Sequence, residues 1–296
     1  MRLSELKLDK NRIISDGEFN HFGFMNSEID GKLFVHYGDK RYKKQLENHN
    51  ITCVICSEKL VHDLPTNIKG IYISDDSKYD YFDIFAQFGD EGVYDDFETR
   101  IGSNCVISDK ANIADRNVII GDNCVVEAFA TINENSILEN GVTIRSNSVI
   151  GTPGLQIVRD NGGLPIMVKH FGGVKICEGS MIYSMVSIER ALFKWDKTII
   201  GNHTFINSFS TVGHACKIGN RTLVASGMKL GGFSTIGDDV WIGIGASIRH
   251  QTRIGNRSQV MMGSIIRKNI DDDMVVVGDR IIPKEKYNKM QKIISH

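Results

Sequence analysis

His214 is the residue whose type and spacing best suit acid–base chemistry. A neutral imidazole, with an unperturbed pKa of ~6.5, can take up a proton near neutral pH. Asp196, eighteen residues earlier, could orient the ring and stabilise its protonated form, whereas Asn207 could hold it only as a neutral partner. His250 follows His214 by thirty-six residues. The alternative for His214, Asp196 and His250 is a solvent-facing polar side chain, so the elements that position them decide the question.

A period of six residues runs through the part of the sequence that contains these candidates. From Ile200 to Ile266 an aliphatic residue recurs at every sixth position, and glycine often follows it. The same register holds backwards to Ile176, with Lys194 as its one exception. Two earlier registers cover residues 120–150 and 101–113. No other internal period is as strong, so this one predicts the architecture.

A six-residue period fits neither an α-helix nor a single alternating strand, but it fits a short strand plus a turn repeated around a coil. Three such units close a triangular prism in which each wall buries one aliphatic side chain per coil. The glycine suits a corner with unusual dihedral angles or a close approach of neighbouring coils. Eighteen residues make one coil, so Asp196 is expected directly beneath His214, which points outwards. His250 is expected two coils along, about 10 Å away.

The remaining segments lack this period. Residues 1–100 have the pattern of an α/β domain, with strand-like runs at 32–36, 51–56 and 70–73 and helix-like spacing at 40–46 and 79–88. Residues 152–173 interrupt the coil domain of 101–271, and their centre, Asp160 to Gly163, predicts a hairpin. Residues 272–296 form a charged tail with a short helix. The predicted fold is therefore mainly β.

Composition excludes several classes of partner. Lys and Arg number 35 against 36 for Asp and Glu, without a basic run, so no nucleic-acid partner is expected. There is neither a signal-peptide pattern nor an apolar run of ~18 residues, so we expect a cytoplasmic protein without an integral membrane segment. The six cysteines are scattered, and Cys53 and Cys56 fall in an apolar run that predicts buried strand thiols.

Several segments in order resemble a known family. The sequences 32–36 and 40–46, then Gly172 to Ile176, Ile188-Glu189-Arg190, Asp196 to Thr198, Ile206-Asn207 and Val212-Gly213-His214 are similar to the UDP-3-O-acylglucosamine N-acyltransferases of lipid A synthesis. The repeat itself resembles the hexapeptide acyltransferase superfamily. This resemblance implies a left-handed parallel β-helix, a nucleotide-sugar-binding N-terminal domain, a homotrimer with sites between subunits, and His214 as catalytic base.

The resemblance also implies binding roles. One of Phe34, Tyr37 and Tyr42 is expected to stack on the nucleotide base, and a place in the domain core is the alternative for each of these rings. Glu189, Arg190 and His250 are expected near the sugar. For the acyl donor, small residues along the prism would let a pantetheine arm lie against it, and a cation would meet its phosphate. A backbone N–H at a glycine corner such as Gly231-Gly232 would stabilise the oxyanion. Ordinary coil packing is the alternative. The donor-binding candidates are Gly232, Gly245, Ala246, Gly263, Ser264, Arg267 and Lys268.

The chain departs from that family at four places. Asn207 stands where the family has an aspartate, Gln251 stands at or beside its second histidine, the uridine-binding stretch is two residues longer, and the C-terminal helical extension is much shorter. We therefore expect a relative with a different sugar and donor, similar to the enzymes that acylate dTDP-linked 4-amino-4,6-dideoxy sugars, including that of the anthrose pathway.

The predicted activity is transfer of an acyl group from acyl-CoA to the amino group of a nucleotide-linked sugar. An acyl-carrier-protein-dependent lipid A enzyme, a sugar O-acyltransferase and a non-catalytic scaffold are the alternatives. A metal hydratase of the γ-carbonic anhydrase kind would need three converging imidazoles. The spacing of His203, His214 and His250 does not reproduce that family's close pair. No metal is therefore expected.

Overall fold

A computed structural model describes residues 1–89 and 96–294 as two compact units. The first combines the N-terminal region with Leu155–Lys169, and the second combines residues 96–154 with the chain from His170 onwards. The repeat pattern placed 152–173 inside the coil domain as an insertion. In the structure, most of that insertion groups with the N-terminal unit instead. Residues 295–296 of the expected tail lie outside the described part.

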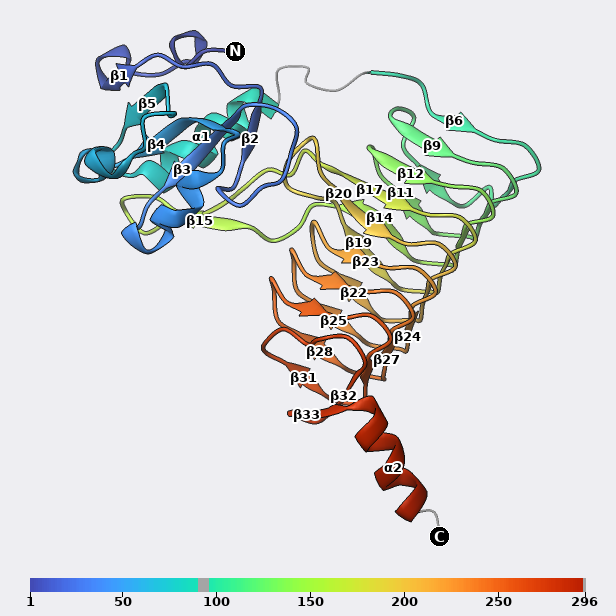
Figure 1. The fold of residues 1–296 in the computed structure, drawn as a ribbon. Helices are drawn as coiled ribbons and strands as arrows, with labels where there is room; N and C mark the ends of the chain where they lie inside the picture. The colour runs from blue at the N-terminus through green and yellow to red at the C-terminus, as the bar shows by residue number, and fades with distance from the viewer. Residues whose placement is uncertain (90–95, 295–296) are drawn as a thin grey trace. The chain divides into compact units, whose positions relative to one another are not determined.

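The second unit is a parallel β-helix with three walls, as the six-residue period predicts. Successive strands of the chain pass from sheet 1 to sheet 2 to sheet 3 and return to sheet 1 (Figure 1). Sheet 1 contains β6 (Arg100–Ile101), β9 (Val118–Ile120), β12 (Ser136–Leu138), β17 (Gly173–Ile176), β20 (Lys197–Ile200), β23 (Lys217–Ile218), β26 (Thr235–Ile236) and β29 (Arg253–Ile254). Sheet 2 contains β7 (Val106–Ile107), β10 (Val125–Val126), β13 (Thr143–Ile144), β18 (Met181–Ile182), β21 (Phe205–Ile206), β24 (Leu223–Val224), β27 (Trp241–Ile242), β30 (Gln259–Val260), β32 (Met274–Val277) and β33 (Arg280–Pro283). Sheet 3 contains β8 (Asn112–Ile113), β11 (Thr131–Ile132), β14 (Val149–Thr152), β19 (Ser187–Glu189), β22 (Thr211–Val212), β25 (Lys229–Leu230), β28 (Ser247–Ile248) and β31 (Ile265–Ile266).

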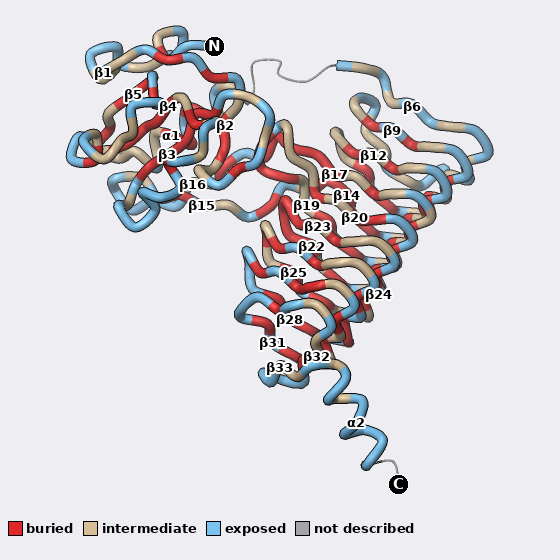
Figure 2. Tube along the Cα trace, in the orientation of Figure 1, coloured by how far each residue is buried: buried red, intermediate tan, exposed pale blue. Residues whose placement is uncertain are grey.

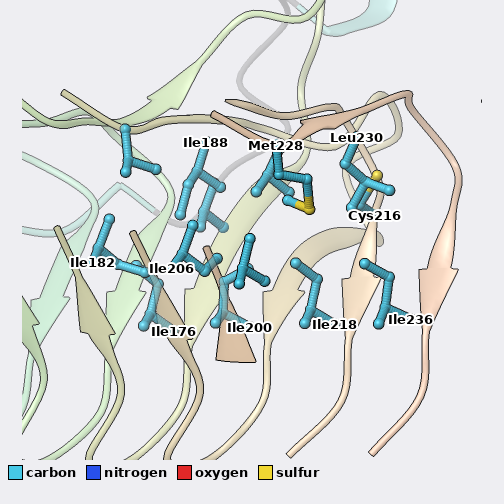
Figure 3. Packing of buried hydrophobic residues seen from close by; sticks show 14 of the residues in the cluster. Ile176, Ile182, Ile188, Ile200, Ile206, Cys216, Ile218, Met228, Leu230 and Ile236 are labelled. Carbon is cyan, nitrogen blue, oxygen red and sulfur yellow. The ribbon is translucent and has the colours of Figure 1, made fainter. Parts of the chain in front are cut away.

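The repeating aliphatic side chains fill the interior of this coil. Each such residue from Ile176 to Ile266 in the main register is at most 4 % exposed, and Figure 3 shows several of them pointing inwards from successive strands. The buried strip runs along the coil from β9 onwards (Figure 2). In the first coil Ile101 is 51 % exposed, and Ile107 and Ile113 are half-buried, because this coil has a neighbour on one side only. Burial of each fully enclosed aliphatic side chain contributes about 1.5–3 kcal/mol.

The glycines that follow the aliphatic residues serve close approach between coils. A Cβ on Gly213 would lie 2.6 Å from the backbone nitrogen of Gly232, and one on Gly201 would lie 2.5 Å from the carbonyl carbon of Gly219. Left-handed dihedral angles occur two positions later, for example at Ala215 with φ 57°. Of the two reasons expected for these glycines, close packing is therefore the one that applies.

A β-hairpin and a helix end the coil. Strand β33 pairs antiparallel with β32, and α2 (Lys284–Ile294) follows it directly. The short helix expected in the tail is thus confirmed.

The N-terminal unit is an α/β structure with a five-stranded sheet in the order β1-β5-β4-β3-β2. Its strands are β1 (Ile13–Ser15), β2 (His21–Gly23), β3 (Leu33–Tyr37), β4 (Ile51–Cys56) and β5 (Gly70–Ile73), and only β1 runs antiparallel to its neighbour. The helical segments are η1 (Leu3–Glu5), η2 (Lys10–Arg12), η3 (Lys40–Glu47), η4 (Glu58–Asp63) and α1 (Ser77–Gly89). The three strand-like runs and both helix-like segments expected in this region are confirmed, although the segment that begins at Lys40 forms a 3₁₀ helix.

Two further local predictions are confirmed in this unit. The insertion forms a hairpin of β15 (Ile157–Arg159) and β16 (Pro165–Met167), with the Asp160 side chain accepting backbone N–H groups across the turn. Cys53 and Cys56 are fully buried on β4. Burial raises the pKa of Cys53 to about 12 and that of Cys56 to about 11, so these thiols are structural groups.

Candidate active site

His214 lies on the corner after β22, where the chain passes from sheet 3 to sheet 1. Its Nδ1 is 3.1 Å from Oε2 of Glu189, the last residue of β19. The same carboxylate oxygen accepts the backbone N–H of His214 at 3.0 Å. The two side chains are 10 % and 29 % exposed, respectively. The carboxylate favours the tautomer that carries its proton on Nδ1, which leaves a lone pair on Nε2.

Other rings enclose the imidazole more than the sequence indicated. Its edge meets Phe233 at a centroid distance of 4.9 Å and an interplanar angle of 88°. His170 lies at 5.1 Å and 78° on another side. Gly232 lies against the ring, because a Cβ there would be 2.7 Å from Nε2. His214 is therefore mostly covered in the single chain, where an outward-pointing side chain was expected.

Asp196 is not the partner of His214, which corrects the sequence-based prediction. Its carboxylate accepts the Lys217 ammonium at 2.5 Å and the backbone N–H of Lys197 at 2.8 Å. Asn207 is also engaged elsewhere, since its Oδ1 accepts the backbone N–H of Ser208 at 2.7 Å on the corner between sheets 2 and 3. Neither side chain orients the imidazole.

The length of one coil explains why Glu189 takes this place. Strand β19 pairs with β22 with Ile188 opposite Val212, an offset of twenty-four residues, whereas Ile200 lies opposite Ile218, an offset of eighteen. The extra hexad is the corner around Lys194, the single break in the aliphatic register. It shifts the neighbour of the His214 corner to Glu189. The Lys194 break was therefore the signal that the expected eighteen-residue offset would fail here.

The three aromatic candidates for base stacking differ in access. Phe34 and Tyr37 are fully buried: Phe34 packs against Phe19 and Tyr81, and Tyr37 belongs to the core beneath the sheet. Their rings cannot stack on a ligand in this structure, which corrects that part of the prediction. Tyr42, on η3, is 47 % exposed and retains an accessible face.

The remaining acceptor candidates are not gathered at one point. Arg190 donates from Nε to the carbonyl of Gly151 at 2.6 Å, so it braces the backbone near β14. His250 is exposed on the same corner as His214, two coils along, with Gly232 between them. Glu189 is the one of the three that contacts the histidine.

The donor candidates are divided between two corners of the coil. Gly232, Arg267 and Lys268 lie on the corner between sheets 3 and 1, whereas Gly245 and Gly263 lie on the corner between sheets 2 and 3 with φ of 68° each. Ala246 and Ser264 are buried, and Ser264 accepts the backbone N–H of Gly278. The N–H of Gly231 donates to the carbonyl of Ile248 at 3.0 Å, so it is not an oxyanion donor.

A hollow on the outer side of sheet 3 brings cations together that the sequence analysis mostly missed. It has a volume of about 590 Å³. Thr211, two residues before Gly213 in the chain, is one of the residues that line it. Arg249 and Arg267 line it, and neither guanidinium has an ion pair within the described residues; Lys229 Nζ donates to the carbonyl of Phe209. The signal was the eighteen-residue offset between Arg249 and Arg267. The lining residues are Thr211, Lys229, Leu230, Gly231, Ser247, Ile248, Arg249, Ile265, Ile266 and Arg267.

Within residues 1–89 and 96–294, no three His, Cys, Asp or Glu side chains are grouped so as to hold a metal ion. In the same ranges, no helix has both the length and the apolar character needed to cross a membrane.

Comparisons with known proteins agree with the repeat and the fold. The model of the family described as bacterial transferase hexapeptide (six repeats) matches residues 117–152, 197–231 and 233–268. A UDP-3-O-acylglucosamine N-acyltransferase of Helicobacter pylori is 33 % identical over 105 residues, which cover 36 % of this chain and 31 % of that protein. An acyl-[acyl-carrier-protein]–UDP-N-acetylglucosamine O-acyltransferase of Thermodesulfovibrio yellowstonii is 34 % identical over 138 residues, covering 45 % of this chain and 53 % of that protein.

The similarity to solved structures concerns the fold. The UDP-N-acetylglucosamine acyltransferase from Campylobacter jejuni superposes with a TM-score of 0.55 at 18 % identity, covering 66 % of this chain and 78 % of the other. The chain thus spans between about a third and about half of the length of the two curated relatives, and both are acyltransferases. Its three matched segments carry the repeat of the bacterial transferase hexapeptide family, and they lie in the coils of the parallel β-helix.

Proposed function

We propose that this protein is an N-acyltransferase that moves an acyl group from an acyl thioester, preferentially acyl-CoA, to the amino group of a nucleotide-linked sugar. The observation that carries the proposal is the His214–Glu189 pair on the corner next to the cation-lined hollow of sheet 3. The imidazole supplies a base and the hollow supplies a surface for an anionic arm. The named relatives support acyl transfer, and one of them is an N-acyltransferase.

In the proposed reaction, the unprotonated amine of the sugar attacks the thioester carbonyl carbon and forms a tetrahedral intermediate. Nε2 of His214 accepts the proton lost by the amine nitrogen, while Glu189 holds the ring and stabilises the imidazolium through Nδ1. The C–S bond then breaks and the thiolate takes a proton, either from His214 or from water. The products are an amide and a free thiol.

The proposed donor is acyl-CoA because the cations lie along the coil. Guanidinium groups bind phosphate through paired N–H donors, and Arg249 and Arg267 stand one coil apart on the rim of the hollow. A carrier protein would need a larger basic surface. The helix α2 has only eleven residues, and its lysines are Lys284, Lys286, Lys289 and Lys292. Lys289 donates a hydrogen bond to Glu285 at 2.5 Å, so α2 offers only a small basic surface to a carrier protein.

For the acceptor, the proposal places the nucleotide at the N-terminal unit, where the exposed ring of Tyr42 offers a stacking face worth about 1–3 kcal/mol per base. The nature of the base and sugar follows the sequence-based expectation of a dTDP-linked 4-amino-4,6-dideoxy sugar. A cytoplasmic location stays a prediction, in keeping with a CoA donor.

A homotrimer is part of the proposal, and sheet 2 supports it. Phe205, Leu223 and Trp241 are in register on successive strands, and they are 40 %, 39 % and 45 % exposed. Monomeric proteins seldom expose a continuous apolar strip of this kind. Trp241→Glu is therefore expected to lower the molecular mass measured by light scattering, whereas Thr235→Glu on sheet 1 is expected to leave it unchanged. A wild-type protein that is monomeric at micromolar concentration contradicts the trimer.

A non-catalytic scaffold is the second candidate, favoured by the small exposure of His214. Steady-state assays distinguish the enzyme from the scaffold. They compare acyl-CoA with the same acyl group on acyl carrier protein, across a panel of nucleotide-linked amino sugars and their hydroxyl analogues. We expect turnover with acyl-CoA and an amino sugar. A higher kcat/KM with the carrier protein would indicate lipid A chemistry. Absence of turnover, together with no thermal stabilisation by any ligand, would support the scaffold.

A further inference from the structure

Gly154 lies directly over the hydrogen bond that joins His214 to Glu189. A Cβ at this position would be 2.5 Å from Nδ1 of His214 and 2.7 Å from Oε2 of Glu189. Gly154 is buried, and its φ lies outside the left-handed range. The backbone conformation therefore does not require glycine here, but the space above the hydrogen bond does.

The space beside the other ring nitrogen of the same imidazole is limited in the same way. A Cβ on Gly232 would be 2.7 Å from both Cε1 and Nε2 of His214, and Gly232 also lacks a left-handed φ. Two glycines thus confine the ring, one beside Nδ1 and one beside Nε2. The edges of the ring meet Phe233 and His170. A ring confined in this way has one rotamer and presents one nitrogen to the carboxylate.

The position of these residues in the chain gives the contacts further meaning. Gly154 is the residue before Leu155–Lys169, and His170 is the residue after it. Both ends of the inserted segment therefore meet at His214, although fifteen residues separate them in the sequence. Phe233 and Gly232, by contrast, belong to the regular coil. The contacts with His214 therefore come from the base of the insertion as well as from the regular coil.

We propose that the base of the inserted hairpin, Gly154 with His170, is a positioning device for His214. Gly154 shields the hydrogen bond between Nδ1 and Glu189 from water and leaves no room for another rotamer, and His170 supports the edge of the ring. Together they hold the imidazole with its proton on Nδ1 and its lone pair on Nε2. This inference deepens the proposed function, because it assigns positioning residues to the proposed base. The tautomer itself does not depend on acyl transfer.

The test is Gly154→Ala in the full-length protein, with Gly162→Ala as the matched control. Gly162 lies in the turn of the same hairpin and lacks a left-handed φ. Its Cβ would lie 3.3 Å from Oδ1 of the half-buried Asp160, so the substitution would affect the turn and would not add an atom against His214. Long-range ¹⁵N NMR of histidine-labelled protein reports the tautomer of His214. We expect the Nδ1-protonated tautomer in wild type and in Gly162→Ala, and a mixture of tautomers in Gly154→Ala.

Kinetics supplies the second measurement. Displacement of a catalytic group by about 1 Å can lower turnover by about 100-fold. Gly154→Ala is therefore expected to lower kcat by about 10- to 100-fold with little change in KM for the donor. His170→Phe keeps an aromatic edge and is expected to retain the wild-type tautomer, whereas His170→Ala is expected to shift it partly.

The outcomes are distinguishable. If Gly154→Ala is folded by circular dichroism and keeps both the wild-type tautomer and wild-type turnover, the positioning role is wrong. If Gly154→Ala loses its fold, the tautomers in His170→Ala and His170→Phe decide, and identical wild-type tautomers in both overturn the proposal. If the tautomer shifts in Gly154→Ala but the wild-type protein acylates no amino sugar, the positioning role stands and the proposed function fails.

Discussion

Two corners of the coil use their side chains in different ways. On the corner between sheets 1 and 2, Arg221 forms two hydrogen bonds with Asp239, both at 2.7 Å, and Arg257 does the same with Asp273 at 2.8 and 2.6 Å. Each of these partners lies on the next coil. On the corner between sheets 3 and 1, His214 has a partner on the preceding coil that breaks the regular offset.

We call these two Arg–Asp pairs the paired ladder. The residue before each member of the paired ladder follows the same regular pattern. The side-chain oxygen of Asp238 accepts the backbone N–H of Asn220 at 2.7 Å, and that of Asn256 accepts the N–H of Asp238 at 2.9 Å. Asn and Asp alternate, so like charges do not stack directly. Polar residues that repeat with the coil therefore satisfy one another. A polar residue whose partner breaks the repeat is the better candidate for function.

The largest expected effect comes from the corner that breaks the repeat. His214→Ala is expected to lower turnover by about 10²–10⁴-fold, because it removes the proposed base. Glu189→Gln is expected to lower kcat by about 10-fold or more, and the double variant to be no worse than His214→Ala, since Glu189 acts through the ring. Steady-state assays of the three variants measure this.

Asp196→Asn is the matched control for that prediction. Its carboxylate pairs with Lys217, so its loss is expected to leave kcat nearly unchanged. A large loss in Asp196→Asn with little loss in Glu189→Gln would restore the partner expected from an eighteen-residue offset. It would also remove the distinction between the two corners.

The second prediction concerns His36, a histidine whose partner is a hydroxyl group and not a carboxylate. Burial, and then the charge of Lys78, lowers its pKa from 6.5 to about 4, and Nε2 lies 3.1 Å from Oγ of Ser77. Below pH 6.5 the unfolded chain takes up a proton at His36 that the folded chain takes up only near pH 4. The contribution of His36 to the free energy of unfolding is therefore fully present above pH 6.5 and is lost as the pH falls towards 4.

Between pH 7 and pH 5 this difference amounts to roughly 2 kcal/mol of unfolding free energy. Urea denaturation of wild type and of His36→Gln at both pH values measures it, and the variant is expected to lose less stability on acidification. Equal losses in the two proteins would show that His36 titrates normally. The contrast between polar residues in different surroundings would then be supported by the residues of the coil alone.

The repeat was readable from the sequence because one aliphatic residue per wall is a strict requirement of the coil. Ile206 and Ile242 are buried where the register placed them. Glu189 was harder to place as the partner of His214, because that depends on the length of the coil containing Lys194, and a corner loop can take up extra residues without disturbing the strands. Phe34 and Tyr37 were misjudged for another reason, since a period-free α/β segment does not reveal which aromatic rings form its core.

The third prediction concerns Arg249 and Arg267, which have no ion pair among residues 1–89 and 96–294, as a contrast to the paired ladder. Arg249→Ala and Arg267→Ala are each expected to raise KM for acyl-CoA by about 10-fold with kcat nearly unchanged, because a charge-assisted hydrogen bond is worth about 1.5–3 kcal/mol. Arg253→Ala is the control, since Arg253 lies on sheet 1 and pairs with Asp272 at 3.3 Å. Equal effects of all three substitutions would show that the hollow is not the donor surface.

The smallest effect is expected from the paired ladder itself. Arg221 lowers the pKa of the Asp239 carboxyl by hydrogen bonding to it, yet both side chains are about half exposed, so water and salt screen the pair. Arg221→Ala and Asp239→Ala are each expected to lower the melting temperature of the coil by less than about 3 °C, with a smaller shift in 1 M NaCl. Turnover is expected to stay at the wild-type level, because neither residue lies on the His214 corner. A loss of more than about 10 °C would mean that the charged ladder sets the register of the coils, a role that the buried aliphatic residues are expected to fill by themselves.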